Sequence, residues 1–397
     1  MTGPAGSAAL SNLRVLDLTR ARAGPTCCRI LADFGADVLK VEAPPGVDPN
    51  EGMSGARNGY DMLNLHRNKR SLTLNLKEKE GREIFLRLAK NADVVVENFR
   101  PDVKERLGVG YEVLRTINPR IILASISGFG QTGPYRLRAG FDQIAQGMGG
   151  LMWVTGVPGE GPMRAGIAIA DSSAGVYAAT GILIALAERE RSGLGQWVQT
   201  SLLQAQIAML DFQAARYLVD GDVPGQAGNE HPYSTPMGVM KTADGYLNIG
   251  VGGDGQWRAL CKALGRPDLA ASPDYASLAD RFRNRSKLMP LLDVIFLTRT
   301  SSEWLEELEA VGVPAGPIYK MDEVFADSQV QHLGIAVPCH HATRGDIAIV
   351  GQPIGLSRTP PEIVTMTPEA GEHTEQILRG LDYGDADIQR LRDAKIV

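Results

Sequence analysis

Short apolar runs alternate with amphipathic stretches through residues 1–150. The apolar runs predict buried strands, and the stretches between them predict helices. Strands that alternate with helices form βαβ units around a parallel sheet. The pattern therefore predicts an α/β fold, with strands at residues 13–18, 36–42, 71–76, 93–97 and 120–127 and helices at 27–34, 77–91 and 101–106.

The pattern changes after residue 150, where two long helices and two breaks are expected. The helices span Ser172 to Glu190, stopped by Gly193, and Gln199 to about Val219. Residues 220–236 are rich in Gly, Pro and Asn, which is typical of a linker between domains. Residues 312–318 indicate a second hinge. Further strands are expected at 246–251 and 347–350, before a polar helical tail.

Composition narrows the functional class mainly by exclusion. The chain has 397 residues, more than one hydrophobic core usually supports, so two domains are expected. Its formal net charge of −5 argues against a nucleic-acid binder. The start of the chain does not resemble a signal peptide, and no apolar run is long enough for a membrane span. The cysteines are too few for a disulfide scaffold and indicate a cytoplasmic setting; they are Cys27, Cys28, Cys261 and Cys339.

Two G-x-G-x-x-G patterns follow expected strands, at Gly128/Gly130/Gly133 and Gly250/Gly252/Gly255. In dinucleotide-binding folds such glycines let the backbone approach a pyrophosphate where a helix begins. The first pattern runs into Pro134 and does not open a helix, whereas the second precedes a possible one. Glycine is abundant, at 45 residues, so chance matches are expected. An NAD-dependent oxidoreductase is kept as a distant alternative.

Other local patterns carry less information. The basic run His66-Arg-Asn-Lys-Arg can clamp phosphates, although a solvated loop is the favoured interpretation. His340 and His341 are adjacent and lack further ligands at metal-binding spacing, so no metal site is expected. The sequence has no Gly-x-Ser-x-Gly nucleophile elbow of the α/β-hydrolases.

Asp171 lies between an apolar run and the expected long helix. As an N-cap, its side chain would accept hydrogen bonds from the first free N–H groups of that helix. The same helix end would keep the carboxylate ionised. An ionised, positioned carboxylate can act as a covalent nucleophile. The local sequence favours the cap and leaves both roles open.

Several sequence segments, taken together in their order along the chain, favour the nucleophile over the helix cap for Asp171. The chain resembles the family III CoA-transferases over nearly its whole length, and it looks closest to the succinate–hydroxymethylglutarate type. The related α-methylacyl-CoA racemases belong to the same group. The resemblance rests on Val15–Pro25, Phe34–Glu42, Arg67–Ser71, Asp93–Pro101, Ser127–Tyr135, Asp171 with Gly175, and Gly312–Pro317.

The resemblance implies a Rossmann-like large domain and a smaller α+β domain, in an interlocked homodimer. The expected division puts the N-terminal part of the large domain at 1–219. The small domain with its flanking hinges is expected at 220–318, and residues 319–397 are expected to return to the large domain.

The resemblance also implies transfer of CoA from a short acyl-CoA to a carboxylic acid, through an aspartyl-CoA thioester on Asp171. No permanently bound cofactor, metal or ATP is expected, and the CoA thioester is the substrate. A glycine loop near residues 225–231 is expected to cover the intermediate, with Gly228, Asn229, Glu230 and His231 as its substrate residues. Expected CoA contacts are Arg22, Ala23, Leu74, Asn75, Leu76, Lys77, Asn98, Phe99, Arg100, Arg106, Ala139, Gly140, Phe141 and Asp142.

Some positions depart from the family pattern. Ala43 and Ala139 replace basic residues that contact CoA in formyl-CoA transferase, although Arg138 is adjacent to the second. Arg22 replaces a glutamine near the reacting centre, and its guanidinium can bind a carboxylate bidentately. We therefore expect a dicarboxylic substrate such as succinyl-CoA, with Arg164 as a weaker candidate for the same contact. An equal alternative directs Arg22 to a CoA phosphate or a neighbouring acid.

The racemase alternative lacks its proton-transfer groups. Racemases need a His and an acidic residue to remove and return the α-proton. Phe141 stands where the histidine would be, and Gly253 stands near the position of a glutamate. A transferase is therefore favoured over a racemase.

Overall fold

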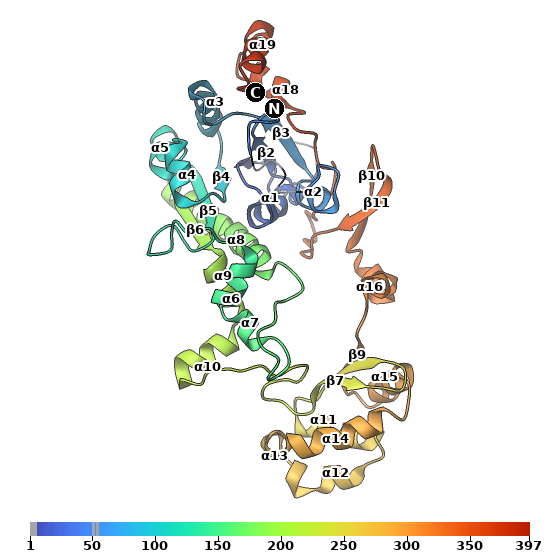
Figure 1. The fold of residues 1–397 in the computed structure, drawn as a ribbon. Coiled ribbons are helices and arrows are strands. Elements are labelled where there is room, and N and C mark those ends of the chain that lie inside the picture. The colour runs from blue at the N-terminus through green and yellow to red at the C-terminus, as the bar shows by residue number, and fades with distance from the viewer. Residues whose placement is uncertain (1–5, 50–51, 53–54) are drawn as a thin grey trace. The chain divides into compact units, whose positions relative to one another are not determined.

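The computed structural model describes residues 6–49, 52 and 55–397, shown as a ribbon in Figure 1. The chain divides into two compact units. The large unit comprises Met1–Leu151, Arg164–Asp222 and Gln331–Val397, and the small unit comprises Met152–Met163 and Val223–Val330. The domain boundaries at residues 219 and 318 stay a prediction from the sequence.

A six-stranded parallel sheet forms the centre of the large unit, which confirms the predicted α/β class. Val15 pairs with Val38 on one side and Val94 on the other, so its strand, β1 (Arg14–Asp17), lies in the middle of the sheet. The strand order is that of a Rossmann fold. The order across the sheet is β3 (Lys69–Thr73), β2 (Asp37–Glu42), β1 (Arg14–Asp17), β4 (Val94–Glu97), β5 (Ile122–Ser127) and β6 (Trp197–Ser201).

Helices cover both faces of this sheet, because successive strand residues point to opposite sides. Val15 packs into one core with α1 (Ala23–Asp33) and α8 (Ile169–Ser192). Leu16 packs into the other core with α3 (Lys79–Ala89), α5 (Tyr111–Ile117), α18 (Thr374–Arg379) and α19 (Asp385–Asp393). The large unit also contains α2 (Tyr60–Leu65), α4 (Pro101–Arg106), α6 (Asp142–Met148), α9 (Leu202–Met209), α10 (Phe212–Asp220) and a hairpin of β10 (Ala336–His341) and β11 (Gly345–Val350).

The helix α8 is the longest element and lies beside α1 (Figure 1). It ends at Gly193, whose φ of 74° is left-handed and suits glycine. It is long and apolar enough to cross a membrane, because an 18-residue window within its 24 residues has a mean hydropathy of 1.5. A buried core helix has the same composition, and the inner face of α8 is buried against α1 and the sheet.

The helix predicted from Gln199 to Val219 is wrong over its first part. Residues 197–201 form β6, which pairs with β5 at the edge of the sheet. The Ser201 hydroxyl then accepts a 3.1 Å hydrogen bond from the Gln204 amide and caps α9. A break follows at Asp211, whose φ is 45°, before α10 begins.

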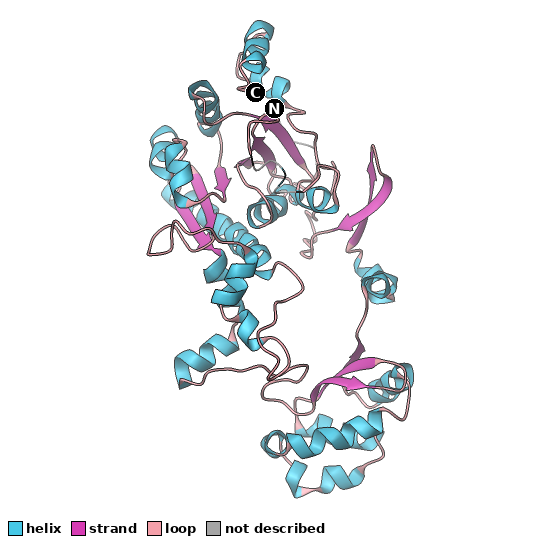
Figure 2. Ribbon diagram, viewed as in Figure 1, coloured by secondary structure: helices cyan, strands magenta, loops and turns pink. Residues whose placement is uncertain are grey.

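The small unit has an antiparallel sheet of β7 (Met237–Lys241), β8 (Tyr246–Gly250) and β9 (Ala315–Pro317), drawn in magenta in Figure 2. Part of the segment expected as the second hinge therefore pairs within a sheet. Trp257, Phe296 and Trp304 fill the core below it. The surrounding helices are α7 (Leu151–Val154), at the join with the large unit, α11 (Asp254–Ala263), α12 (Pro267–Ala271), α13 (Leu278–Arg283), α14 (Arg285–Phe296), α15 (Ser301–Ala310), α16 (Met321–Ala326) and, across the second join, α17 (Ser328–Leu333).

Neither glycine pattern has the setting of a dinucleotide site. Gly128, Gly130 and Gly133 lie in the loop after β5, and the next helix begins only at Asp142. The second pattern does open a helix, because α11 begins at Asp254, but it leaves an antiparallel sheet instead of a βαβ unit. The fingerprint requires a parallel strand–helix–strand arrangement.

Candidate active site

Three helix N-termini in the large unit carry the candidate catalytic groups. Arg22 immediately precedes α1, Asp142 is the first residue of α6, and Asp171 lies in the first turn of α8. Helices α1 and α8 approach closely at Gly175, where an added Cβ would lie 2.5 Å from the carbonyl oxygen of Ala23. This close packing brings the start of α8 next to the start of α1.

Asp171 is not the N-cap that the sequence suggested. The helix begins at Ile169, its N-cap is Ala168, and Ala168 makes no side-chain cap. The carboxylate of Asp142 takes the capping role. Its Oδ1 accepts hydrogen bonds from the amides of Ala170, at 2.9 Å, and Asp171, at 3.4 Å. The side chain of Asp171 is therefore not used to cap its own helix.

Asp142 is itself held from its other side. The side-chain amide of Gln146, one turn along α6, donates to Oδ2 of Asp142 at 2.6 Å. The same Nε2 donates to the Ile167 carbonyl at 3.0 Å. Arg164 lies 3.9 Å from the same Oδ2. Asp142 is buried, so these contacts fix its orientation and, through it, the first turn of α8.

The electrostatics of Asp171 also differ from the expectation. Burial, with the nearby charge of Asp142, raises the pKa of Asp171 from 3.8 to about 6, and the charge of Arg22 only partly offsets this rise. The helix terminus was expected to keep the carboxyl ionised, and burial acts against this expectation by raising the pKa. At pH 7 the carboxylate still predominates and is more basic than an ordinary aspartate.

Arg22 forms an ion pair with Asp61 of α2, with Nη2 and Oδ1 2.7 Å apart. A neighbouring acid was one of the partners that the sequence left open for this guanidinium. Its charge also lowers the pKa of Asp171. Arg22 therefore lies within electrostatic range of the candidate nucleophile and in contact with a second carboxylate.

The segments expected to contact CoA follow the carboxyl ends of the strands. Residues 74–77 follow β3, residues 98–100 follow β4, and Arg22 with Ala23 follows β1. Parallel α/β sheets bind ligands at this edge. The side-chain amide of Asn98 donates to the Arg20 carbonyl at 2.8 Å, and the Arg20 amide donates back at 2.9 Å, so the loops after β1 and β4 are joined.

The individual side chains in these segments differ in exposure. Leu74 is buried in the core, whereas Lys77, Arg100 and Arg106 are exposed. Arg106 pairs with Asp102 at 3.1 Å. In the last segment Gly140 packs against Gly128 just after β5, with Ala139 and Phe141 exposed beside it. Asn75, Leu76, Phe99 and Asp142 are partly or fully buried, and contact of any of these residues with CoA stays a prediction.

The basic run at His66–Arg70 is neither a solvated loop nor an open phosphate clamp. Arg67 pairs with Asp33 at 2.7 Å, Lys69 with Asp17 at 2.8 Å, and Arg70 with Asp37 at 2.7 Å. The first two pairs are fully buried. Each of these three cations therefore forms an ion pair with an aspartate on β1, α1 or β2. The local sequence does not indicate these pairs.

The expected substrate loop belongs to the small unit. Glu230 forms an ion pair with Arg285. The Nδ1 atom of His231 accepts hydrogen bonds from the amides of Tyr233, at 3.2 Å, and Ser234, at 3.1 Å. Gly228 has a φ of 60°. Cover of the intermediate by Gly228–His231, including Asn229, stays a prediction.

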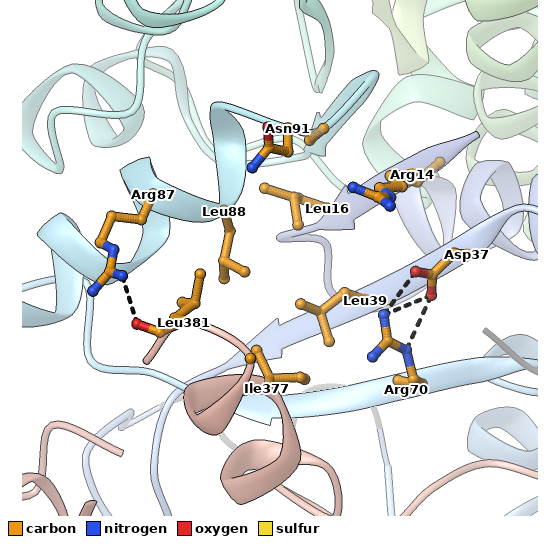
Figure 3. Close-up of a pocket in the computed structure, with 13 residues that line it drawn as sticks. Arg14, Leu16, Asp37, Leu39, Arg70, Arg87, Leu88, Asn91, Ile377 and Leu381 are labelled. Atoms are coloured by element: carbon orange, nitrogen blue, oxygen red, sulfur yellow. Dashed lines mark hydrogen bonds and ion pairs between the residues drawn. The ribbon is translucent and has the colours of Figure 1, made fainter. Parts of the chain in front are cut away.

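A small pocket, with a volume of about 170 Å³, lies at the amino ends of the parallel strands. Arg14 and Asp37 line it at the amino ends of β1 and β2, and Figure 3 shows Arg70 beside Asp37. Arg22 instead follows the carboxyl end of β1, so this pocket is separate from the candidate site. Among the described residues no group of three or more His, Cys, Asp or Glu side chains is placed to hold a metal ion.

The sequence of residues 10–374 matches the model of CoA-transferase family III. The chain belongs to this family. Enzymes of the family use CoA thioesters as substrates.

Named relatives of this CoA-transferase match nearly its whole length. It is 41% identical to a succinate–glutarate CoA-transferase of Agrobacterium fabrum, over 94% of this chain and 96% of that one. It is 37% identical to the human succinyl-CoA:glutarate CoA-transferase, over 98% and 90% of the two chains. It is also 37% identical to a succinyl-CoA–D-citramalate CoA-transferase of Chloroflexus aurantiacus, over 98% of both.

Solved structures agree with the fold. A CaiB/BaiF family protein from Brucella suis is 37% identical, with a TM-score of 0.81 over 95% of this chain and all of that chain. A Mycobacterium tuberculosis protein is 29% identical, with a TM-score of 0.82 over 94% of this chain and 99% of that chain. The CoA-transferase therefore has the expected α/β fold class.

Proposed function

We propose that this CoA-transferase moves CoA from succinyl-CoA, or another dicarboxylic acyl-CoA, to a carboxylic acid through an aspartyl-CoA thioester on Asp171. The observation that carries the proposal is the carboxylate of Asp171, which is mostly buried and has a pKa of about 6. It lies in the first turn of α8, at the carboxyl ends of the parallel strands. The relatives named for succinyl-CoA or succinate support the choice of donor.

The proposed chemistry needs no proton transfer to a leaving group. The Asp171 carboxylate attacks the thioester carbonyl, the C–S bond breaks, and a mixed anhydride and CoA thiolate form. The thiolate then attacks the aspartyl carbonyl, giving the aspartyl-CoA thioester and the free donor acid. The acceptor carboxylate attacks this thioester and repeats the two steps in reverse, which restores Asp171.

In these steps the protein positions the carboxylate of Asp171 and leaves it incompletely solvated. Incomplete solvation leaves Asp171 more basic, and so more nucleophilic, than an exposed aspartate. Asp142 holds the amides of Ala170 and Asp171, so the backbone under the nucleophile stays fixed during attack. Backbone N–H groups in the first turn of α1 are the candidate donors to the tetrahedral oxyanions, because those in the first turn of α8 already donate to Asp142, Ile167 and Ala168.

Arg22 is proposed to bind the distal carboxylate of a dicarboxylic substrate. Its charge acts on Asp171, so a carboxylate held by the guanidinium lies near the reacting carbon. Arginine recognises carboxylates in a bidentate geometry that lysine cannot reproduce. Arg164, near Asp142, is a second cation that can serve a longer acid.

A homodimer is proposed as the working form. The outer faces of α8 and α10 expose apolar side chains, including Ile184, Leu218 and Val219, which are 64%, 79% and 80% exposed. Patches of this kind on a soluble protein mark interaction surfaces. We propose that a second copy of the chain covers them, that the enzyme works in the cytoplasm, and that it keeps no permanent cofactor.

The test is a thioester exchange assay. The protein is incubated with succinyl-CoA and a panel of mono- and dicarboxylic acids, and new CoA thioesters are identified by mass spectrometry. We expect transfer to dicarboxylic acids and its loss in Asp171→Ala, with the fold intact by circular dichroism. Full transfer by Asp171→Ala would overturn the proposed mechanism, and racemisation of a 2-methylacyl-CoA without exchange would favour the racemase alternative.

A further inference from the structure

The backbone around Arg22 is tightly fixed, although its side chain is partly exposed. The Leu18 amide donates to the Val96 carbonyl at 2.9 Å, and the amide of Thr19 donates to the buried Asp17 carboxylate at 2.9 Å. The Thr26 amide donates to the Arg22 carbonyl at 2.9 Å where α1 begins. Any change of partner at Arg22 therefore involves only its side chain.

The ion pair between Arg22 and Asp61 differs from the pair between Arg70 and Asp37 in the same unit. Arg70 contacts both oxygens of Asp37, at 2.7 and 2.8 Å, in a bidentate pair that is largely buried. Arg22 contacts one oxygen of Asp61, and the two side chains are 32% and 37% exposed. A one-point contact at this exposure is weak and easily exchanged.

We propose that Asp61 occupies Arg22 in the free enzyme and is displaced by the distal carboxylate of a dicarboxylic substrate. Asp61 then determines how strongly dicarboxylic acids bind relative to monocarboxylic acids. It is a specificity-determining residue that does not touch the reacting atoms. This inference rests on the proposed function, because it assigns Arg22 the distal carboxylate.

Two physical effects give Asp61 this role. A substrate carboxylate must compete with Asp61 for the guanidinium, and it must also approach the negative charge of Asp61. The competing pair is partly exposed, so its removal changes binding by no more than about five-fold. A monocarboxylic acid of equal length has no group for Arg22, so neither effect acts on it.

The experiment compares the wild-type enzyme with Asp61→Asn, using succinyl-CoA as the saturating donor. The KM of glutarate is measured directly, and pentanoate is measured as an inhibitor of the same reaction. Glu112→Gln is the matched control, because Glu112 pairs with Arg115 at 2.6 Å on the exposed surface of the same unit. Asp61→Ala serves as a second variant, and thermal melting shows whether each variant folds.

We expect Asp61→Asn to lower the KM of glutarate about two- to five-fold, with kcat and the inhibition constant of pentanoate unchanged. Glu112→Gln should alter neither constant. An unchanged or raised KM for glutarate in folded Asp61→Asn and Asp61→Ala would overturn the inference, as would equal changes for both acids. A wild-type enzyme that transfers no CoA would instead refute the proposed function itself.

Discussion

At the scale of single residues, Asp171 as the proposed nucleophile must meet two demands that oppose each other. A nucleophile must be ionised at working pH, yet a well-solvated carboxylate attacks poorly. The site meets both by burying Asp171 beside a second carboxylate, Asp142, while the charge of Arg22 limits the resulting rise in pKa. The consequence is a charged group that costs stability in the folded state.

The stability cost gives a prediction for Asp171→Asn. A pKa raised from 3.8 to about 6 means that the favourable contribution of this group is present below pH 3.8 and is lost as the pH rises through about 6. We expect Asp171→Asn to increase the free energy of unfolding at pH 7 by about 1–3 kcal/mol and to abolish transfer. Urea denaturation at pH 7 and pH 4 measures this, and the two proteins should converge at the lower pH.

Equal stabilisation of Asp171→Asn at both pH values would show that the gain does not come from ionisation. A loss of stability of Asp171→Asn at pH 7 would show that the ionised carboxylate of Asp171 has favourable interactions that outweigh the cost of its burial.

A second prediction concerns Asp142→Asn. The amide oxygen of asparagine can still accept from the backbone of Ala170 and Asp171, but the negative charge is gone. The pKa of Asp171 should fall, because the charge of Asp142 is one cause of its rise. We expect the acidic limb of the kcat/KM profile to move to lower pH. A limb that stays in place would contradict an electrostatic coupling between the two carboxylates.

Asp142→Ala serves as the companion variant, because it removes the cap as well as the charge. We expect it to destabilise the protein by about 0.5–2 kcal/mol, the usual cost of losing a helix cap.

The sequence identified Asp171 but not its surroundings. The motif order along the chain indicated Asp171 as the candidate nucleophile, whereas the predicted start of its helix was misplaced by a few residues, as is common for helix ends. The true cap, Asp142, lies 29 residues earlier in the chain. Nothing in the local sequence around Asp61 marks it as the partner of Arg22. Such pairings depend on the folded arrangement, which local patterns do not contain.

At the scale of elements, the contact between α1 and α8 sets the position of Asp171, the proposed nucleophile. Gly175 lets the helices approach, and a Cβ there would lie 2.5 Å from the Ala23 carbonyl oxygen and 2.7 Å from Cβ of Thr26. Distances this short require the backbones to move apart. The start of α8 would move with them, and Asp171 lies one turn before Gly175.

Gly175→Ala is therefore expected to destabilise the protein by about 1–3 kcal/mol and to lower kcat, although alanine favours helix formation. Gly255→Ala in α11 is the matched control, since an added Cβ there meets no atom within 4 Å. Thermal melts and transfer rates of both variants give the comparison. A Gly175→Ala protein as stable and active as Gly255→Ala would contradict the role of this contact.

Most strands of the sheet in the large unit were predictable from the sequence, but the edge strand β6 was not. Strands β4 and β5 are nearly continuous apolar runs, which is the mark of parallel strands buried on both faces, and β1 and β2 have apolar residues between charged ends. The third strand reads Lys-Arg-Ser-Leu-Thr, and only its second half lies in the predicted strand at residues 71–76. The sixth strand reads Trp-Val-Gln-Thr-Ser and is only partly buried, so it carries no such signal. Helix-favouring residues follow it directly, and they extended the predicted helix into the strand.

At the scale of the whole molecule, the exposed apolar surface predicts self-association. None of the residues of α10 is buried within the chain, although Phe212, Tyr217 and Leu218 are large and apolar. Sedimentation equilibrium at micromolar concentration should give the mass of a dimer. Ile184→Glu on the exposed face of α8 should weaken this dimer, whereas a wild-type monomer would contradict the proposal.

The covalent aspartyl-CoA intermediate is the central claim, and hydroxylamine trapping tests it most directly. The enzyme is incubated with succinyl-CoA without an acceptor, quenched with hydroxylamine, digested, and analysed by peptide mass spectrometry. We predict a hydroxamate on the side chain of Asp171, formed only when the acyl-CoA is present. An enzyme that transfers CoA at full rate while Asp171 stays unlabelled, or while another residue carries the label, would contradict the account.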